Sequence, residues 1–192
     1  MKKYIIMTLV GILISSCATT TEKEIRNLER FDKVNLTGRV ELKLEKNANN
    51  SVEILTKKDA DMAGITTEVR NGELFIYHED DCDSCKTPKY IVKLNHSGIS
   101  DLTLTGVIRI SSDEVISQTN LAIRGDGVLN GNIEVAVDNL HVDLNGISNM
   151  YISGSADTSD LKISGIGFFN VRNLETKSGK NVSEGLAIIN KL

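Results

Sequence analysis

The chain has 192 residues, enough for one domain with a sizeable hydrophobic core. Hydrophobic residues make up 40% of it, which argues against general disorder, and aromatic residues make up only 4%, so the core must be built from aliphatic side chains. A formal net charge of −4 leaves no basic footprint for binding nucleic acid.

Residues 1–16 have the features of a lipoprotein signal peptide. Two lysines precede an apolar run, Tyr4 to Ile14, that is too short to span a bilayer comfortably. The run ends in an aliphatic residue, two serines and Cys17, an order that resembles the bacterial lipobox. Cys17 is therefore the expected lipid attachment site. A plain signal peptide that happens to precede a cysteine is the alternative.

The expected location is the cell envelope, with a lipid anchor in the outer membrane. Ala18 follows Cys17, whereas an aspartate at that place in Gram-negative lipoproteins resembles an inner-membrane retention signal. Cleavage removes two lysines and leaves an acidic chain, so attachment would depend on the lipid and not on charge. Residues 17–30 are polar and charged, and we expect a flexible tether. A short helical turn around Ile25 and Leu28 is the alternative.

From Phe31 onward the sequence has the alternation of β-strands. Residues 34–44 alternate apolar and polar side chains, and residues 52–55 and 90–94 are further expected strands. Residues 65–69 and 74–76 flank Asn71-Gly72, and Asn-Gly is the strongest two-residue turn signal, so these segments predict a β-hairpin. We expect a single domain over residues 31–192.

A short phrase, apolar-x-apolar-x-Gly, recurs about every 20 residues in the second half of the chain. Another apolar side chain follows each glycine by four residues. A repeat of this length predicts an all-β fold, a right-handed parallel β-helix or solenoid with one coil per repeat. An antiparallel sandwich, which also shows alternation and regular turns, is the alternative. The four phrases are Leu102-x-Leu104-x-Gly106, Leu121-x-Ile123-x-Gly125, Val142-x-Leu144-x-Gly146 and Leu161-x-Ile163-x-Gly165.

Equivalent residues of the four phrases should stack as columns inside the coils, with the intervening residues facing water. Leu186, Ile188 and Ile189 would then form a final partial coil or cap. The three predicted columns are Leu102, Leu121, Val142 and Leu161; Leu104, Ile123, Leu144 and Ile163; and Ile110, Leu129, Met150 and Phe169.

Several of these segments resemble the bacterial head GIN domain family, described as an auto-transporter adhesin. The resemblance lies in residues 31–34, in the hairpin at 65–76, and in the phrases Gly125-Asp126-Gly127 and Ser164-Gly165-Ile166-Gly167, and it covers the chain from Phe31 onward. It implies a secreted or lipid-anchored β-helical protein. The shared motifs are structural, so the resemblance supports the fold more than any activity.

Cys82 and Cys85 form the only Cys-x-x-Cys motif. They lie in an acidic loop of an exported protein, where neighbouring carboxylates disfavour a reactive thiolate, and we predict a local disulfide. Zinc bound by Cys82, Cys85, His78 and His96 is the alternative, because the donor types suit that metal.

No catalytic constellation is apparent in the sequence. His78, His96 and His141 have no serine or carboxylate partner at a recognisable spacing, and His141 is expected on the outside of a strand. Asp126, Asp143 and Asp157 could reach calcium at turns, but their spacing matches no established calcium repeat. We expect no cofactor, no metal and no enzymatic activity.

The predicted function is that of a lipid-anchored binding or adhesion module at the cell surface. Its membrane contact is the lipid on Cys17, and its ligand would be a glycan or an envelope protein. A structural envelope lipoprotein that makes protein contacts is the alternative. A polysaccharide-active enzyme is a third possibility, although no acidic pair falls in register on the outward columns.

Overall fold

The computed structural model describes residues 22–56, 62–78 and 90–190. These residues form one nine-stranded sheet with no α-helix, which confirms the all-β class. The elements are β1 (Lys23–Asn27), β2 (Lys33–Lys46), β3 (Ser51–Thr56), the 3-10 helix η1 (Met62–Gly64), β4 (Ile65–Arg70), β5 (Glu73–His78), β6 (Tyr90–His96), β7 (Asp101–Ser112), β8 (Ile116–Asn170) and β9 (Leu174–Asn190).

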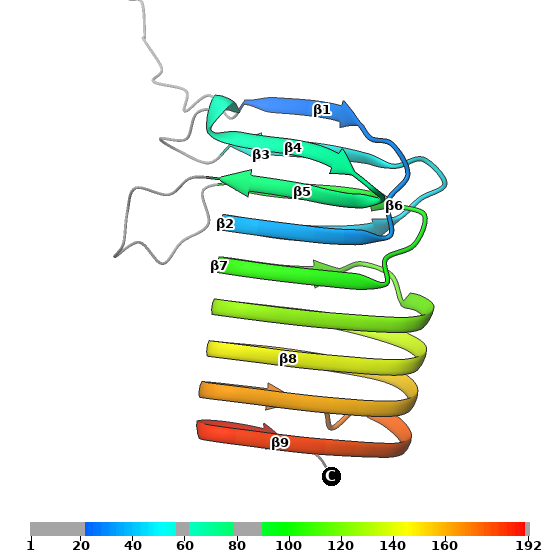
Figure 1. Cartoon of the computed structure of the whole chain (residues 1–192), viewed down its shortest axis with the longest axis vertical. Helices are drawn as coiled ribbons and strands as arrows, with labels where there is room; N and C mark the ends of the chain where they lie inside the picture. Colours follow the sequence, from blue (N-terminus) through cyan, green and yellow to red (C-terminus); the bar gives the residue numbers. More distant parts are fainter. Residues whose placement is uncertain (1–21, 57–61, 79–89, 191–192) are drawn as a thin grey trace, which may run out of the picture.

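The main ladder of the molecule is parallel. β2 pairs with β7, β7 with the start of β8, and the end of β8 with β9, all in parallel register. β8 is 55 residues long and winds through successive coils, which Figure 1 shows as ribbons stacked one below another. Antiparallel pairs occur among the described strands only in the N-terminal part, so these registers are not those of an antiparallel sandwich.

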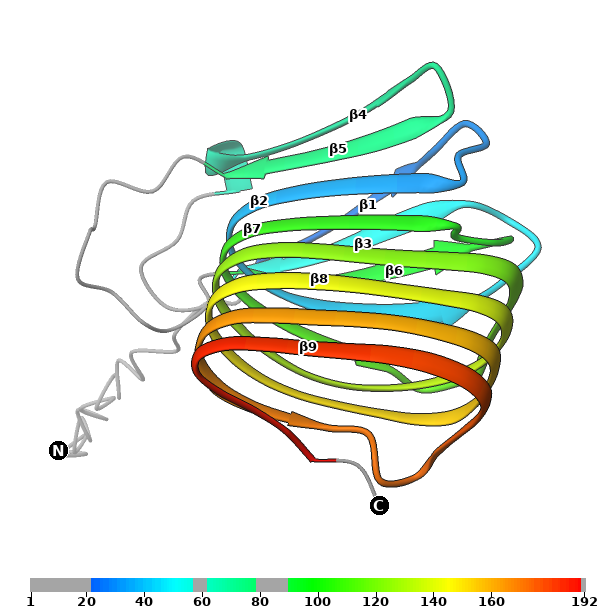
Figure 2. The same cartoon turned by 60° about the horizontal axis from the view of Figure 1, so that its bottom comes forward.

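The N-terminal end of the stack is covered by short strands. β5 pairs with the first part of β2, and β6 pairs with its second part, both in parallel. β4 lies on β5, and β3 and β1 continue the sheet from β6 (Figures 1 and 2). The predicted hairpin is confirmed: Asn71 and Gly72 join β4 to β5 with φ angles of 52° and 77°.

The tether prediction needs a correction, because β1 lies within residues 17–30. β1 pairs antiparallel with β3 over its whole length and is neither a free spacer nor a helical turn. Arg26 also donates hydrogen bonds to the Ile65 carbonyl oxygen and to Thr67 Oγ1, at 3.0 and 3.1 Å. Charged side chains are typical of an edge strand, so a polar segment can pair in this way without a hydrophobic signal.

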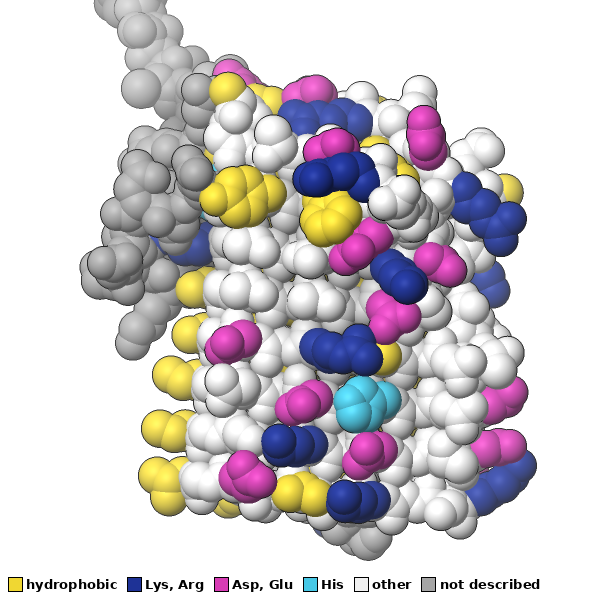
Figure 3. Space-filling model, in the orientation of Figure 1, with side chains coloured by type: hydrophobic (Ala, Val, Ile, Leu, Met, Phe, Trp, Pro, Cys, Tyr) yellow, Lys and Arg dark blue, Asp and Glu magenta, His cyan; other side chains and the backbone are white. Residues whose placement is uncertain are grey.

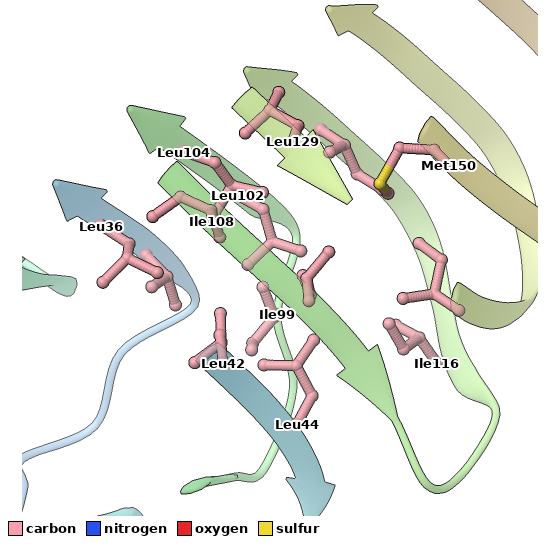
Figure 4. Packing of buried hydrophobic residues seen from close by; sticks show 14 of the residues in the cluster. Leu36, Leu42, Leu44, Ile99, Leu102, Leu104, Ile108, Ile116, Leu129 and Met150 are labelled. Carbon is pink, nitrogen blue, oxygen red and sulfur yellow. The ribbon is translucent and has the colours of Figure 1, made fainter. Parts of the chain in front are cut away.

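All twelve side chains of the predicted columns are buried, with at most 1% of each exposed. Figure 4 shows aliphatic side chains of successive strands, among them Leu36, Leu104 and Leu129, gathered in this interior. The inward and outward assignment along the strands is therefore confirmed. The core is almost entirely aliphatic, as the shortage of aromatic residues required.

The predicted alignment of the second coil is wrong by two residues. Leu102 pairs with Ile123, not with Leu121, and Leu104 pairs with Gly125. The two additional residues lie between Ser111 and Ala122, the segment that contains the turn from β7 to β8. A shift of two residues keeps every side chain on its own face of the strand, which is why the burial prediction survived the register error.

A column of glycines marks the same corner of every coil, and we call its members the ladder glycines. Each has a positive φ. In Gly146, where φ is 102°, an added Cβ would overlap the carbonyl oxygen of Gly127, so the corner has no room for a side chain. In the second coil the ladder glycine is Gly127, which pairs with Gly106, and not Gly125 of the repeated phrase. The ladder glycines are Gly38, Gly106, Gly127, Gly146, Gly165 and Gly185.

The C-terminal end of the stack becomes polar inside. Asn181 follows Leu161 in one interior column, and Ser183 follows Ile163 in the next. Leu186, Ile188 and Ile189, predicted to form a final partial coil or cap, lie in β9, the last coil. Ile189 packs against the core, whereas Leu186 and Ile188 are 75% and 59% exposed on the outside. A terminal repeat with polar groups at its open end is how a stack of repeats ends in water.

Candidate functional site

Five positions after three of the ladder glycines lie Asn132, Tyr151 and Asn170. They are separated by 19 residues, the same interval as Gly127, Gly146 and Gly165, so the three side chains stand on consecutive coils in one outward column. Residues stacked in this way lie about 4.8 Å apart. The fold thus places one aromatic side chain between two amides.

A surface hollow of about 590 Å³ opens at this column. Tyr151 is 45% exposed, whereas its neighbour Ile152 is buried and forms part of the floor. None of the lining residues carries a charge. The lining residues are Asn132, Tyr151, Ile152, Ser153, Asn170 and Asn173.

Asn173, which lines the hollow, belongs to a turn at Val171–Asn173. Gly154 pairs with Leu174, so the chain uses one more residue between Asn170 and Leu174 than between Tyr151 and Gly154. The turn is closed by a 3.1 Å hydrogen bond from Leu174 N–H to the Val171 carbonyl oxygen. This additional residue makes the chain project beside the hollow.

The polar groups around Tyr151 retain hydrogen-bonding capacity. Asn170 Oδ1 accepts a hydrogen bond from Arg172 N–H at 3.1 Å, which leaves the two N–H donors of its amide for another partner. Asn132, Ser153 and Asn173 make no side-chain hydrogen bond within the described part of the chain. The hollow therefore offers donors, acceptors and an aromatic face to an uncharged ligand.

A smaller hollow of about 240 Å³ lies beside Gly125. Arg124, Asp126 and Asp143 line it, and Asn145 Nδ2 donates to Asp126 Oδ1 at 3.3 Å. The third aspartate considered for calcium, Asp157, instead pairs with Lys177 at 2.7 Å. Within residues 22–56, 62–78 and 90–190, no group of three or more His, Cys, Asp or Glu side chains is placed to hold a metal ion.

His141 lies on the outside of its strand, as predicted, and has a partner that the sequence analysis missed. Its Nδ1 is 3.4 Å from Asp160 Oδ2, and both side chains are substantially exposed. Asp160 is 19 residues further along, so it occupies the same outward column one coil later. A search for residue pairs separated by one coil would have found it.

The structure does not bring His78 and His96 together. His78 lies next to Gly38, and His96 pairs with Lys46, so the two are eight residues apart along β2. Burial, reinforced by the charge of Lys46, lowers the pKa of His96 to about 4. Their separation counts against a zinc site that uses both. Cys17, Cys82 and Cys85 lie outside the described residues.

An exposed hydrophobic ridge follows the corner of the stack, one residue after the ladder glycines. Figure 3 shows it as a vertical row of hydrophobic side chains along the left edge, beside a face of mixed charges. Ile147, Ile166 and Leu186 are each more than half exposed. The ridge comprises Val107, Val128, Ile147, Ile166 and Leu186.

The hollow around Tyr151 was not predicted from the sequence. The hydrophobic repeat identifies inward residues such as Met150, but it gives no signal for the outward neighbour Tyr151. The available signal was the 19-residue spacing of Asn132, Tyr151 and Asn170. The turn at Val171–Asn173 could not be anticipated, because one added residue in a loop leaves no mark on hydrophobic periodicity. No helix able to cross a membrane occurs in the described residues.

Solved structures of similar fold come from species of Bacteroides, Parabacteroides and Clostridium. A protein described as a "putative adhesin" from Bacteroides fragilis matches with a TM-score of 0.72 at 13% identity, over 91% of this chain and 98% of that one. A "putative lipid binding protein" from Parabacteroides distasonis matches with a TM-score of 0.60 at 15% identity, over 91% and 98%. At these identities the likeness concerns the fold alone.

A third structure, described as a "putative cell adhesion protein" from Clostridium sporogenes, has a TM-score of 0.50 at 15% identity, over 90% of this chain and 99% of that one. Among curated proteins none matches this sequence. The family model described as "putative auto-transporter adhesin, head GIN domain" matches residues 30–188, which is most of the chain. The protein therefore belongs to the head GIN domain family of adhesins, and membership of an adhesin family indicates the cell envelope.

Proposed function

We propose that the protein is a non-catalytic adhesion module, held at the cell surface by a lipid and binding its partner through the hollow around Tyr151. The observation that carries the proposal is the 45% exposed aromatic ring of Tyr151, set between two amides in an uncharged hollow. Ligand sites are typically hollows that combine an apolar or aromatic surface with a few polar groups, as this one does. Membership of an adhesin family supports the same conclusion.

The proposed framework is a right-handed parallel β-helix of about 20-residue coils over residues 31–192, with β1 as an added edge strand. The parallel registers from β2 to β9 support it, as does the recurrence of the ladder glycines at intervals of 19 to 21 residues after Gly106. Such a framework suits adhesion because its outward columns are rigid and evenly spaced.

The proposed anchor is a lipid on Cys17, which becomes the first residue after removal of the signal peptide, residues 1–16. The order of residues before Cys17 supports it. Cys17→Ala should abolish incorporation of labelled fatty acid and leave the signal uncleaved by the lipoprotein peptidase. Labelling of the variant equal to that of the parent would contradict the anchor.

The proposed state of Cys82 and Cys85 is a local disulfide. They are the only cysteines that follow Cys17, and an exported protein meets oxidising conditions. Intact mass of the isolated protein, with alkylation before and after reduction, should show no free thiol until the bridge is reduced. Free thiols together with stoichiometric zinc would contradict the disulfide.

Surface adhesion is tested on intact cells. Protease added outside should digest the protein without lysing the cells, and deletion of the gene should reduce attachment of cells to immobilised glycans or envelope proteins. Full protection from protease on intact cells, with digestion only after lysis, would place the protein on the periplasmic side and contradict surface adhesion.

A structural envelope lipoprotein remains the second candidate, and the hydrophobic ridge favours it. Five aliphatic side chains in one line would bind a protein that lays an apolar edge along the stack. A photo-crosslinking residue in place of Ile166 would capture such a protein in living cells. In that case the Tyr151→Ala change should leave the cross-link intact, because Tyr151 lies outside the ridge.

A further inference from the structure

We infer that the hollow around Tyr151 binds a neutral carbohydrate. The inference rests on the proposed function, since it assigns a ligand class to the same surface. Three features support this ligand class: the ring of Tyr151, the hydrogen-bonding groups beside it and the absence of charge among the lining residues.

The ring of Tyr151 provides a stacking surface. A sugar ring has one face of C–H groups, which packs on an aromatic face, and hydroxyl groups around its edge. Tyr151 is exposed at the centre of the column, with Asn132 and Asn170 about 4.8 Å away on either side. A sugar stacked on the ring therefore has its hydroxyl groups next to both amides.

The polar groups of the hollow match the chemistry of hydroxyl groups. A hydroxyl both donates and accepts hydrogen bonds, and an asparagine amide offers two donors and one acceptor. Asn132, Asn173 and Ser153 make no side-chain hydrogen bond within the described residues, and Asn170 keeps its donors. Four polar side chains with free hydrogen-bonding groups thus surround one ring. An apolar ligand would leave these groups without partners, whereas a sugar can bond to them.

The charge and size of the hollow narrow the class of carbohydrate. None of the six lining residues is ionisable at neutral pH, whereas the hollow beside Gly125 contains Arg124, Asp126 and Asp143. Arg172 lies next to Asn173 in the chain but does not line the hollow, so a sulfated or sialylated sugar would lose solvation and gain no ion pair from the lining residues. The volume of about 590 Å³ lies within the usual range for small-molecule sites.

The test uses the full chain, purified in detergent, on an array of immobilised oligosaccharides. The array carries neutral hexose and N-acetylhexosamine oligosaccharides together with sulfated and sialylated ones. Selective binding to neutral members is expected, followed by titration of the best of them in solution. Tyr151→Ala should weaken the affinity about tenfold or more, and Tyr151→Phe should stay within about threefold, because the ring is kept.

Tyr77→Ala is the matched control, since Tyr77 is 46% exposed and lies at the other end of the stack, in β5. It should bind like the parent. The inference fails if no neutral oligosaccharide binds, if charged members bind better, or if Tyr151→Ala binds as well as the parent. Attachment of cells without any sugar binding would refute this ligand and leave surface adhesion standing. Sugar binding by a protein that external protease cannot reach on intact cells would support this ligand and refute surface adhesion.

Discussion

At the residue scale, the side chain of Leu144 extends into the space above Gly125 of the preceding coil. Gly125 precedes it in the same interior column, and a Cβ on Gly125 would come within 2.9 Å of Leu144 Cδ2, so the leucine fills room that the glycine leaves. Leu144→Ala should lower the free energy of unfolding by about 2–5 kcal/mol, because it removes buried methyl groups and leaves a cavity in the interior. Denaturant unfolding of the mature chain measures this change.

Lys162→Ala is the control for Leu144, since Lys162 is exposed one residue from the buried Leu161. It should change the free energy of unfolding by no more than about 0.5 kcal/mol. Similar losses in the two variants would mean that the inward and outward assignment is reversed.

Gly146 tests the corner of the coil. With φ at 102° and the carbonyl oxygen of Gly127 against the missing side chain, Gly146→Val combines backbone strain with a steric clash between coils. We expect a loss of at least about 3 kcal/mol or failure to fold, seen by circular dichroism and thermal unfolding. Gly125→Ala, whose backbone lacks a positive φ, meets only side chains and should cost about 1–3 kcal/mol. Gly146→Val with parental stability would rule out the close approach.

His96 gives a pH dependence with a defined sign. Its pKa is lowered to about 4 in the folded protein from about 6.5 when unfolded, chiefly by burial, so the unfolded chain binds the proton first. The stabilisation is complete above pH 6.5 and is lost as the pH falls towards 4. The free energy of unfolding should therefore decrease over this range, by at most about 1.4 kcal/mol per pH unit from this group.

His96→Asn should flatten the slope between pH 6.5 and 4 relative to the parent in urea titrations at several pH values. An equal slope in the parent and the His96 variant would show that other groups cause the acid sensitivity.

At the element scale, β9 separates the apolar interior from water. Asn181 and Ser183 replace the leucine and isoleucine of the preceding coil, so the last coil tolerates its open end. A chain that ends at Asn181 would expose Ile163 and the edge of β8 without this polar layer. We expect self-association by light scattering and a lower midpoint in urea. A truncated chain that stays monomeric and as stable as the parent would remove the capping role of β9.

The burial of side chains along each strand was more predictable than the register between coils. Alternation placed Leu144 and eleven other side chains inside correctly, because burial depends only on odd or even position. Register between coils was less predictable, because Gly125 and Gly127 both fit the repeated phrase and only packing selects Gly127. β1 was missed because an edge strand with charged residues carries little hydrophobic signal.

At the scale of the whole molecule, the parallel stack was predictable and the hollow was not. Nearly all of the repeat signal comes from interior contacts, which every coil must make with the next. The hollow depends on which residues happen to occupy an outward column, and on the added residue at Val171–Asn173. A role for Tyr151 could therefore be inferred only from the structure.

The position of the hollow along the stack has a mechanical consequence. Tyr151 lies in the later coils of β8, whereas β1, the first described strand after the proposed anchor residue Cys17 in the sequence, lies at the opposite end of the stack (Figure 1). Tension between a bound surface and the membrane would pull along the stack, parallel to the hydrogen bonds that join one coil to the next. Under load these bonds would open in sequence, a coil at a time, so the protein would yield gradually by lengthening instead of breaking at once.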